Sequence, residues 1–212
     1  MRCFLAVDLP EAVREAIAAV QARLAADLDR RPAGDRVRWV AAANLHLTLR
    51  FLGEIDEVGA GQVTGVVERV AAEHAPIAVE AAGLGLFTGP VRPRVVWVGL
   101  TAGSPDVGRL ARSLEEALAT VGFAPEPRPF RAHLTIGRIR PGRTMPDGRV
   151  GGGGRIRPGG RGGLADALSA AGAPRFGGWT VRDVVLYRSY LGPRGPRYEA
   201  LRRFSLAGAT PA

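Results

Sequence analysis

The sequence contains the same order of predicted elements twice, and this repeat constrains the fold more than any other feature. In the first copy, an apolar strand at 4–9 precedes a long helix and then a strand with His-Leu-Thr at 46–48. In the second copy, an apolar strand at 95–100 precedes a long helix and a strand with His-Leu-Thr at 133–135. The histidine follows the start of the apolar strand by 42 residues (4 to 46) in one copy and by 38 (95 to 133) in the other. Matched order and spacing predict an internal duplication, with too few copies for a solenoid.

The alternation of strands and helices, with some strands antiparallel, predicts the α+β class. A length of 212 residues suits one domain, so we predict that 1–212 form a single domain of two pseudo-symmetric lobes. The hydrophobic pattern predicts strands at 3–9, 37–40, 45–52, 77–82, 95–100, 130–139, 181–190 and 198–206. It predicts helices at 10–29, 56–75, 104–121 and 164–171. The Gly- and Arg-rich stretch at 141–163 is predicted to be a flexible insertion loop.

Strand parity places the polar residues of both motifs on matching faces. Side chains of a strand alternate between its two faces, so His46 and Thr48 share one face while the aliphatic residues between them share the other. His133 and Thr135 have the same relation on their strand. If the two strands come together about a pseudo-twofold axis, two histidines and two threonines converge on one cleft.

That set of side chains suits acid–base chemistry at phosphorus. Because an imidazole titrates near neutral pH, one histidine can remove a proton from water while the other protonates the departing oxygen. Threonine hydroxyls can donate hydrogen bonds to the non-bridging phosphate oxygens. We therefore predict no metal and no cofactor. Two histidines without a nearby Cys, Asp or Glu on the same faces make a poor zinc site, and a Ser-His-Asp triad is disfavoured because no Gly-x-Ser-x-Gly occurs.

Three arginines lie close to the motifs in sequence. Arg131 has the parity of His133, so its guanidinium could reach the cleft and hold phosphate. Arg50 has the parity of His46, but we predict a solvated arginine at the end of its strand. Arg138 has the opposite parity and could enter the site only through a β-bulge at Gly137.

The aromatic residues of the predicted strands are interpreted as core residues and not as platforms for nucleic-acid bases. Phe51 has the parity of the aliphatic residues on its strand, so it is predicted to point into the core. Trp39 and Trp97 lie in apolar strands and are predicted to be buried.

The charge is unevenly distributed. The chain has no lysine and 29 arginines. Residues 1–127 hold 13 Arg against 16 acidic residues, a net of −3, whereas 128–212 hold 16 Arg against 4, a net of +12. A basic half favours a polyanionic partner such as nucleic acid, but a GC-rich codon bias would also replace lysine by arginine. The 141–163 segment has the same two interpretations, as a track for a nucleic-acid backbone or as an insertion made basic by composition.

Several features favour an intracellular setting. The single cysteine, Cys3, cannot form an intramolecular disulfide and lies in an apolar strand, where it is predicted to be buried. No apolar run reaches about 18 residues, so no transmembrane helix is predicted, and acidic residues follow the first apolar stretch directly. The expected location is the cytoplasm.

The twin motifs resemble the H-x-T-x motifs of the two-histidine (2H) phosphoesterases. Their flanks are similar to those of the bacterial and archaeal RNA 2',3'-cyclic phosphodiesterases, historically named 2'-5' RNA ligases. The resemblance extends from about residue 4 to 206 and leaves out a Gly-rich stretch near 150–163. Its segments are 38–40 (RWV), 44–54 (NLHLTLRFLGE), 93–100 (PRVVWVGL), 186–189 (LYRS) and 191–193 (LGP).

The resemblance implies a bilobal fold in which antiparallel sheets line a central cleft and helices lie outside. It implies hydrolysis of a terminal 2',3'-cyclic phosphate of RNA to a 2'-phosphomonoester, with His46 as proton donor to the leaving 3' oxygen and His133 as proton acceptor from water. Thr48 and Thr135 match the threonines that hold the phosphate. Run backwards with a 5'-hydroxyl in place of water, the chemistry makes a 2'-5' linkage without ATP. The partners implied are RNA or nucleotide ends with a 2',3'-cyclic phosphate. We expect no membrane partner, and we expect the protein to be a monomer.

Two other interpretations remain open at the level of sequence. The chain could hydrolyse small cyclic nucleotides or 2'-5' oligoadenylate, or it could be a non-catalytic RNA-binding module on the same scaffold. The presence of both His-x-Thr pairs favours an enzyme, because binding alone needs arginine and not paired imidazoles.

Overall fold

The computed structural model describes residues 1–30, 37–88, 93–139, 143–144, 150–151, 163–193 and 195–209. Its strands are β1 (Arg2–Asp8), β2 (Val37–Trp39), β3 (His46–Glu54), β4 (Ile77–Thr88), β5 (Pro93–Ala102), β6 (His133–Ile139), β7 (Arg143–Thr144), β8 (Val150–Gly151), β9 (Arg175–Val181), β10 (Asp183–Gly192) and β11 (Gly195–Ser205). Its helices are α1 (Glu11–Asp29), the 3-10 turn η1 (Ala42–Asn44), α2 (Glu57–Glu73), α3 (Ser104–Ala119) and α4 (Leu164–Ala171).

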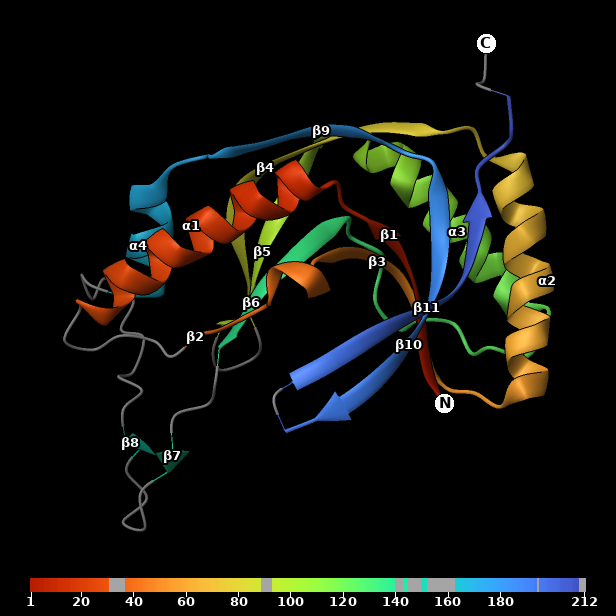
Figure 1. The fold of residues 1–212 in the computed structure, drawn as a ribbon, viewed down its shortest axis with the longest axis horizontal. Coiled ribbons are helices and arrows are strands. Elements are labelled where there is room, and N and C mark those ends of the chain that lie inside the picture. The colour runs from red at the N-terminus through yellow and green to blue at the C-terminus, as the bar shows by residue number, and fades with distance from the viewer. Residues whose placement is uncertain are drawn as a thin grey trace.

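Nine strands form one curled antiparallel sheet (Figure 1). The order is β11-β10-β1-β3-β6-β5-β4-β9, and β2 pairs with β6 beside this path. The strands that carry the two His-Leu-Thr motifs, β3 and β6, are therefore neighbours in the middle of the sheet. This arrangement confirms the predicted α+β class with antiparallel strands. That 1–212 form a single domain stays a prediction.

The helices lie outside the sheet in two pairs. Helix α1 packs against α4 and β9 on one half, and α2 packs against α3, β10 and β11 on the other (Figure 1). Each long helix starts at a boundary that the sequence supplies. Pro10 precedes α1, and Asp56 caps α2 by accepting a hydrogen bond from Gly59 N at 2.8 Å. Helix α3 turns its buried residues to the sheet at helical spacing: Val107, Leu110, Ala111, Leu114 and Leu118.

The predicted boundaries of most helices and strands agree with the structure to within a few residues. Strand β9 was missed because Gly177 and Gly178 interrupt its pattern, and β6 begins at His133 and not at 130. Within 141–163, only the short strands β7 and β8 and the last residue are described. The prediction of a flexible loop falls mainly on residues outside the described ones and stays a prediction.

A β-bulge follows the His-Leu-Thr motif in β3. Leu5 of β1 pairs with Arg50 while Ala6 pairs with Thr48, so Leu49 has no partner. Beyond a bulge the two faces of a strand exchange. Arg50 is consequently only 6% exposed and Phe51 is 55% exposed. The prediction of a solvated Arg50 and the prediction that Phe51 points into the core are both wrong.

Strand β6 contains the same irregularity at the equivalent place. Val96 of β5 pairs with Gly137 while Trp97 pairs with Thr135, so Ile136 has no partner. The Ile136 carbonyl accepts hydrogen bonds from the Val40 backbone at 2.9 Å and from Gln21 Nε2 at 2.8 Å. Gly137 and Arg138 thus take the places that Arg50 and Phe51 have in β3, and Arg138 is exposed. The sequence required a bulge at Gly137 for Arg138 to enter the site. The structure has a bulge here, and its extra residue is Ile136, one position before Gly137.

The side chain of Arg50 connects β3 to the segment that leads into β6. Its Nε lies 2.7 Å from Glu115 Oε2 of α3, and its Nη1 lies 2.7 Å from Glu126 Oε1. Its Nη2 donates to the Ala124 carbonyl, and the Glu126 backbone N–H donates to Glu115 Oε1 at 2.6 Å. Charge-assisted contacts of this kind are stronger than neutral hydrogen bonds, so they hold the bulge in β3 and the start of the second motif together.

We expect Arg50→Met to destabilise the fold, because it leaves two carboxylates facing a buried position without their cation. The expected loss in the free energy of unfolding is about 1–3 kcal/mol, measured by urea titration. Arg109→Met is the matched control, because Arg109 pairs with Asp106 on the surface and exposed pairs contribute roughly 0–1 kcal/mol. Equal losses in the two variants would contradict a structural role for the Arg50 contacts.

Candidate active site

The two motif strands meet at one backbone pair. Leu47 of β3 lies opposite Leu134 of β6, and both side chains are fully buried in the core. In this antiparallel register His46 lies opposite Thr135, and Thr48 lies opposite His133. Because side chains alternate, these four residues share the face opposite to the core. The structure thus brings together on one face the residues that the sequence singled out.

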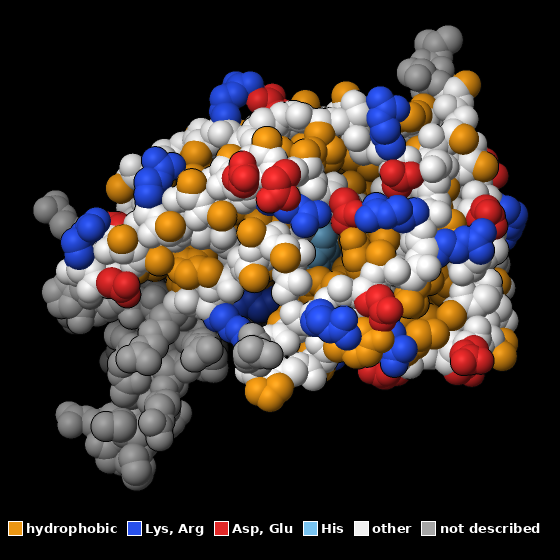
Figure 2. Space-filling model, viewed as in Figure 1, with side chains coloured by type: hydrophobic (Ala, Val, Ile, Leu, Met, Phe, Trp, Pro, Cys, Tyr) orange, Lys and Arg blue, Asp and Glu red, His pale blue; other side chains and the backbone are white. Residues whose placement is uncertain are grey.

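Both histidines are held by the same local contact. His46 Nδ1 lies 2.7 Å from the Asn44 carbonyl, and His133 Nδ1 lies 2.7 Å from the Arg131 carbonyl. A carbonyl can only accept, so each Nδ1 carries the hydrogen and donates it. This leaves Nε2 of each ring available for proton transfer. A histidine side chain is visible in a hollow near the centre of the face in Figure 2, with arginine side chains around it.

The two rings differ in what they pack against. His46 packs on Phe4, at 4.9 Å between ring centroids, and meets the Tyr198 ring edge-on at 5.3 Å. His133 meets the Phe87 ring edge-on at 4.7 Å. His46 is therefore enclosed by aromatic side chains of β1 and β11, whereas His133 borders on β4.

Among the described residues, the backbone partner of one histidine is a carboxylate residue and that of the other is a glycine. Asp8 of β1 is the backbone partner of His46, and the equivalent partner of His133 on β5 is Gly99. The Tyr187 hydroxyl donates to Asp8 Oδ1 at 2.5 Å, and Arg203 Nη2 lies 2.6 Å from Asp8 Oδ2. Burial and the bond to Asp8 raise the pKa of Tyr187 to about 12, so this hydroxyl stays a donor. The sequence carried no signal for this network, whose members are far apart in the chain.

Burial and the arginines set the protonation of the site. Burial is the main cause that lowers the pKa of both His46 and His133 below the ordinary value. The hydrogen bond to a backbone carbonyl raises the pKa of each histidine and offsets part of this effect. The Asp8 carboxylate offsets a further part for His46, whose pKa is still lowered overall. The Arg138 guanidinium lowers the pKa of both histidines, which places its charge near both rings. Arg131 is exposed beside His133.

Comparison with known proteins identifies the family. The LigT like Phosphoesterase model matches residues 7–97. The RNA 2',3'-cyclic phosphodiesterase of Archaeoglobus fulgidus is 33% identical over 204 residues, which cover 96% of this chain and 99% of that protein. That of Methanothermobacter thermautotrophicus is 32% identical over 97% of this chain and 99% of its own. The chain belongs to the LigT-like phosphoesterase family.

Solved structures of the family have the same fold. The protein TT0787 of Thermus thermophilus matches with a TM-score of 0.72 at 29% identity, covering 99% of this chain and 100% of that one. E. coli LigT complexed with 3'-AMP matches with a TM-score of 0.68 at 28% identity, covering 97% of each chain. The implied 2H phosphoesterase fold is thereby confirmed.

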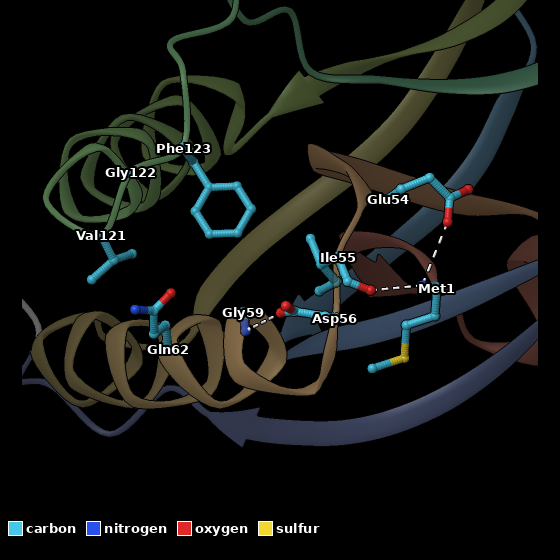
Figure 3. A pocket seen from close by; sticks show the side chains of 9 residues that line it. All are labelled: Met1, Glu54, Ile55, Asp56, Gly59, Gln62, Val121, Gly122 and Phe123. Carbon is cyan, nitrogen blue, oxygen red and sulfur yellow. Dashed lines mark hydrogen bonds and ion pairs between the residues drawn. The ribbon is translucent and has the colours of Figure 1, made fainter.

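The phosphoesterase has two pockets of note. One of about 390 Å³ is lined by His133, Arg131 and the partly buried Trp97, which was predicted to be a core residue. The other, of about 600 Å³, lies between the start of α2 and the end of α3 and contains no histidine (Figure 3). There the amino terminus contacts the Ile55 carbonyl at 2.6 Å and Glu54 at 3.4 Å, so its charge is already paired.

No group of three or more His, Cys, Asp or Glu side chains among the described residues is arranged to hold a metal ion. None of the described helices is long and apolar enough to cross a membrane.

We expect Arg138→Gln to raise the pKa of His46 and His133, because the substitution removes a cation that disfavours both imidazolium ions. The chain has three histidines, so the imidazole signals in a two-dimensional NMR titration can be assigned one by one.

The third histidine supplies the control for this titration. The Arg109 guanidinium lowers the pKa of His74, so Arg109→Gln should raise that pKa and leave the two motif histidines unchanged. If Arg138→Gln moves His74 as much as His46 and His133, Arg138 does not act on the site.

Proposed function

We propose that this phosphoesterase hydrolyses the terminal 2',3'-cyclic phosphate of RNA to a 2'-phosphomonoester by metal-independent catalysis with two histidines. The observation that carries the proposal is the arrangement of His46 and His133 on one face, each held through Nδ1 and each beside the threonine of the other motif. Relatives that match along almost the whole chain are named for this activity.

The proposed reaction is an in-line displacement at phosphorus. His133 Nε2 takes a proton from water as the water oxygen attacks. The bond from phosphorus to the ribose 3' oxygen breaks, and His46 donates its proton to that oxygen. The product carries a 2'-phosphate and a free 3'-hydroxyl.

The different surroundings of the two histidines support these roles. Asp8 favours the protonated form of His46, which a proton donor needs. His133 has Gly99 in place of a carboxylate, so it lacks the group that favours the protonated form of its counterpart, and a proton acceptor needs the neutral form. With 5'-hydroxyl RNA in place of water, the same groups would form a 2'-5' linkage.

The threonines and arginines are proposed to hold the phosphate. In the register Thr48 lies opposite His133 and Thr135 lies opposite His46, so each hydroxyl is proposed to donate to a non-bridging oxygen. The Arg138 guanidinium adds positive charge where negative charge increases during the reaction. Arg131 lies at the edge of the site beside His133 and is the second candidate for contact with phosphate.

Phe51 is proposed to stack on the base of the terminal nucleotide. The bulge in β3 turns its ring to the face of His46, where it is more than half exposed and 6.2 Å from the Phe4 ring. The Phe4 ring in turn lies against His46. A ring exposed at this place can accept a base whose ribose is attached to the phosphate between the histidines.

A direct test uses an RNA oligonucleotide that ends in a 2',3'-cyclic phosphate, incubated in the presence of EDTA. We expect complete conversion to a 2'-phosphate end, resolved from the 3'-phosphate by chromatography. A 3'-phosphate product would reverse the proposed leaving group, and loss of activity with EDTA that added metal restores would contradict metal independence.

The two histidines are tested by kinetics. His46→Ala and His133→Ala should each lower kcat by about 10²–10⁴-fold, because each removes one proton transfer. The double variant should be barely slower than either single one, since acid and base act as a unit. Circular dichroism checks that the variants fold. Full activity in either single variant is incompatible with the mechanism.

Phe51→Ala should raise KM for a nucleoside 2',3'-cyclic phosphate roughly 5- to 100-fold with a smaller effect on kcat, because stacking on a base contributes about 1–3 kcal/mol. Phe51→Trp should retain binding. The control is Leu191→Ala, which removes another exposed apolar side chain, at the end of β10. Equal changes in KM for Phe51→Ala and Leu191→Ala would remove the stacking role.

A further inference from the structure

Two arginines lie directly opposite each other near the motif histidines, and the reaction proposed above uses only one of them. In the pairing of β2 with β6, Arg38 is the backbone partner of Arg138 (strands β2 and β6 in Figure 1). Both side chains are exposed. Residues directly opposite in an antiparallel pair have Cα atoms about 4.5–5.5 Å apart, so the pairing places two long cationic side chains next to each other.

Arg38 is on the face of the sheet that carries the histidines. A Cβ on Gly137 would lie 2.6 Å from the Val37 side chain, so Val37 points to the same face as that Cβ. Because side chains alternate along a strand, Arg38 points to the other face, together with Arg138. The bulge in β6 gives Arg138 the face of the His-Leu-Thr motif. Both cations therefore lie on the face of the proposed phosphate site.

Neither cation is neutralised within the described part of the chain. No ion pair among the described residues involves Arg38 or Arg138. Arg50 and Arg203, by contrast, are each paired with a carboxylate. Like charges directly opposite in a sheet are destabilising, and an anion bound beside them relieves this repulsion. A phosphate group suits such a place, because guanidinium groups bind it with strong, charge-assisted hydrogen bonds.

The guanidinium of Arg38 reaches the start of β11. A Cβ on Gly195, the first residue of β11, would lie 2.6 Å from Arg38 Nη2, so the absence of a side chain there leaves room for the guanidinium. Tyr198 follows three residues later in β11 and meets the His46 ring edge-on at 5.3 Å. Arg38 therefore lies on the side of the site where His46 and β11 meet.

The proposed orientation of the nucleotide specifies which phosphate would reach Arg38. Strand β3 runs from His46 toward Phe51, and β6 runs antiparallel to it toward Arg138 and its partner Arg38. Phe51 and Arg38 consequently lie at opposite ends of the site. In ribose, the base and the 5' carbon are attached on opposite sides of the ring, and the 5' carbon is on the side of the 3' oxygen. With the base on Phe51 and the 3' oxygen at His46, the 5' carbon extends toward Arg38.

We propose that Arg38 binds the phosphodiester on the 5' side of the terminal nucleotide. The inference rests on the proposed function. Arg138 then contacts the cyclic phosphate that reacts, and Arg38 contacts the phosphate that links the terminal nucleotide to the rest of the strand. Arg38 is thus a specificity-determining residue, through which the enzyme favours the end of an RNA strand over a free nucleoside 2',3'-cyclic phosphate.

The test uses two dinucleotides that differ only in the charge of one linkage. Both end in adenosine 2',3'-cyclic phosphate, and both begin with 2'-deoxyadenosine, so that no neighbouring hydroxyl attacks the linkage. One has an ordinary 3'-5' phosphodiester, and the other has a neutral methylphosphonate in its place. The measured quantity is the ratio of kcat/KM for the charged dinucleotide to kcat/KM for the neutral one, with the 2'-phosphate product resolved by chromatography.

The wild type should favour the charged dinucleotide about tenfold, because a hydrogen bond to a charged group contributes more than one to a neutral group. Arg38→Gln should remove most of this preference. Arg197→Gln is the matched control, because Arg197 is also an exposed arginine and lies over the Tyr190 ring at 4.5 Å. As the neighbour of Tyr198 in β11, Arg197 points to the opposite face of that strand, so its variant should keep the preference of the wild type.

The outcomes separate this proposal from the proposed function. If the wild type hydrolyses both dinucleotides equally well, or if Arg38→Gln keeps the preference of the wild type, the role of Arg38 is overturned and the proposed function stands. Equal losses of preference in Arg38→Gln and Arg197→Gln would show a general effect of positive charge and would also overturn it. If the wild type opens the cyclic phosphate of neither dinucleotide, the proposed function itself fails.

Discussion

The pairing of Leu47 with Leu134 is the contact on which the arrangement of the site depends. Burial of these two side chains fixes which face of each central strand is apolar, because a slip of one residue would expose them and bury the histidines. Everything polar in both motifs is thereby turned to the opposite face. The backbone carbonyls two residues before each histidine then orient the two rings in the same way.

The two His-Leu-Thr motifs have similar local geometry, and different residues at equivalent positions give the two histidines different surroundings. Asp8 in one half corresponds to Gly99 in the other, so one histidine has a carboxylate partner and its counterpart has none. Phe51 corresponds to Arg138, so an exposed ring faces one side of the site and a cation lies near both histidines. A symmetric scaffold can in this way provide an acid and a base from the same residue type.

The elements of the fold were predictable because hydrophobic periodicity is a local property of the sequence. The two bulges were not, since a bulge changes which face a residue takes without changing the residues themselves. That is why Phe51 and Arg50 were assigned to the wrong faces while His46 and His133, which precede the bulges, were placed on one side. The partners of Arg50 and Asp8 come from distant segments, which a local pattern does not specify. The charge asymmetry is also partly neutralised by ion pairs between the halves, namely Arg175–Glu80, Arg202–Glu68 and Arg203–Asp8.

The central claim is that the two equivalent histidines have opposite roles in proton transfer. It is tested most directly with a 2',3'-cyclic substrate whose ribose 3' oxygen is replaced by sulfur, because a thiolate leaves with less help from an acid. The account predicts that this substrate restores most of the activity of His46→Ala and little of that of His133→Ala. Restoration of His133→Ala instead would reverse the two roles, and equal restoration of both variants would contradict the division of roles altogether.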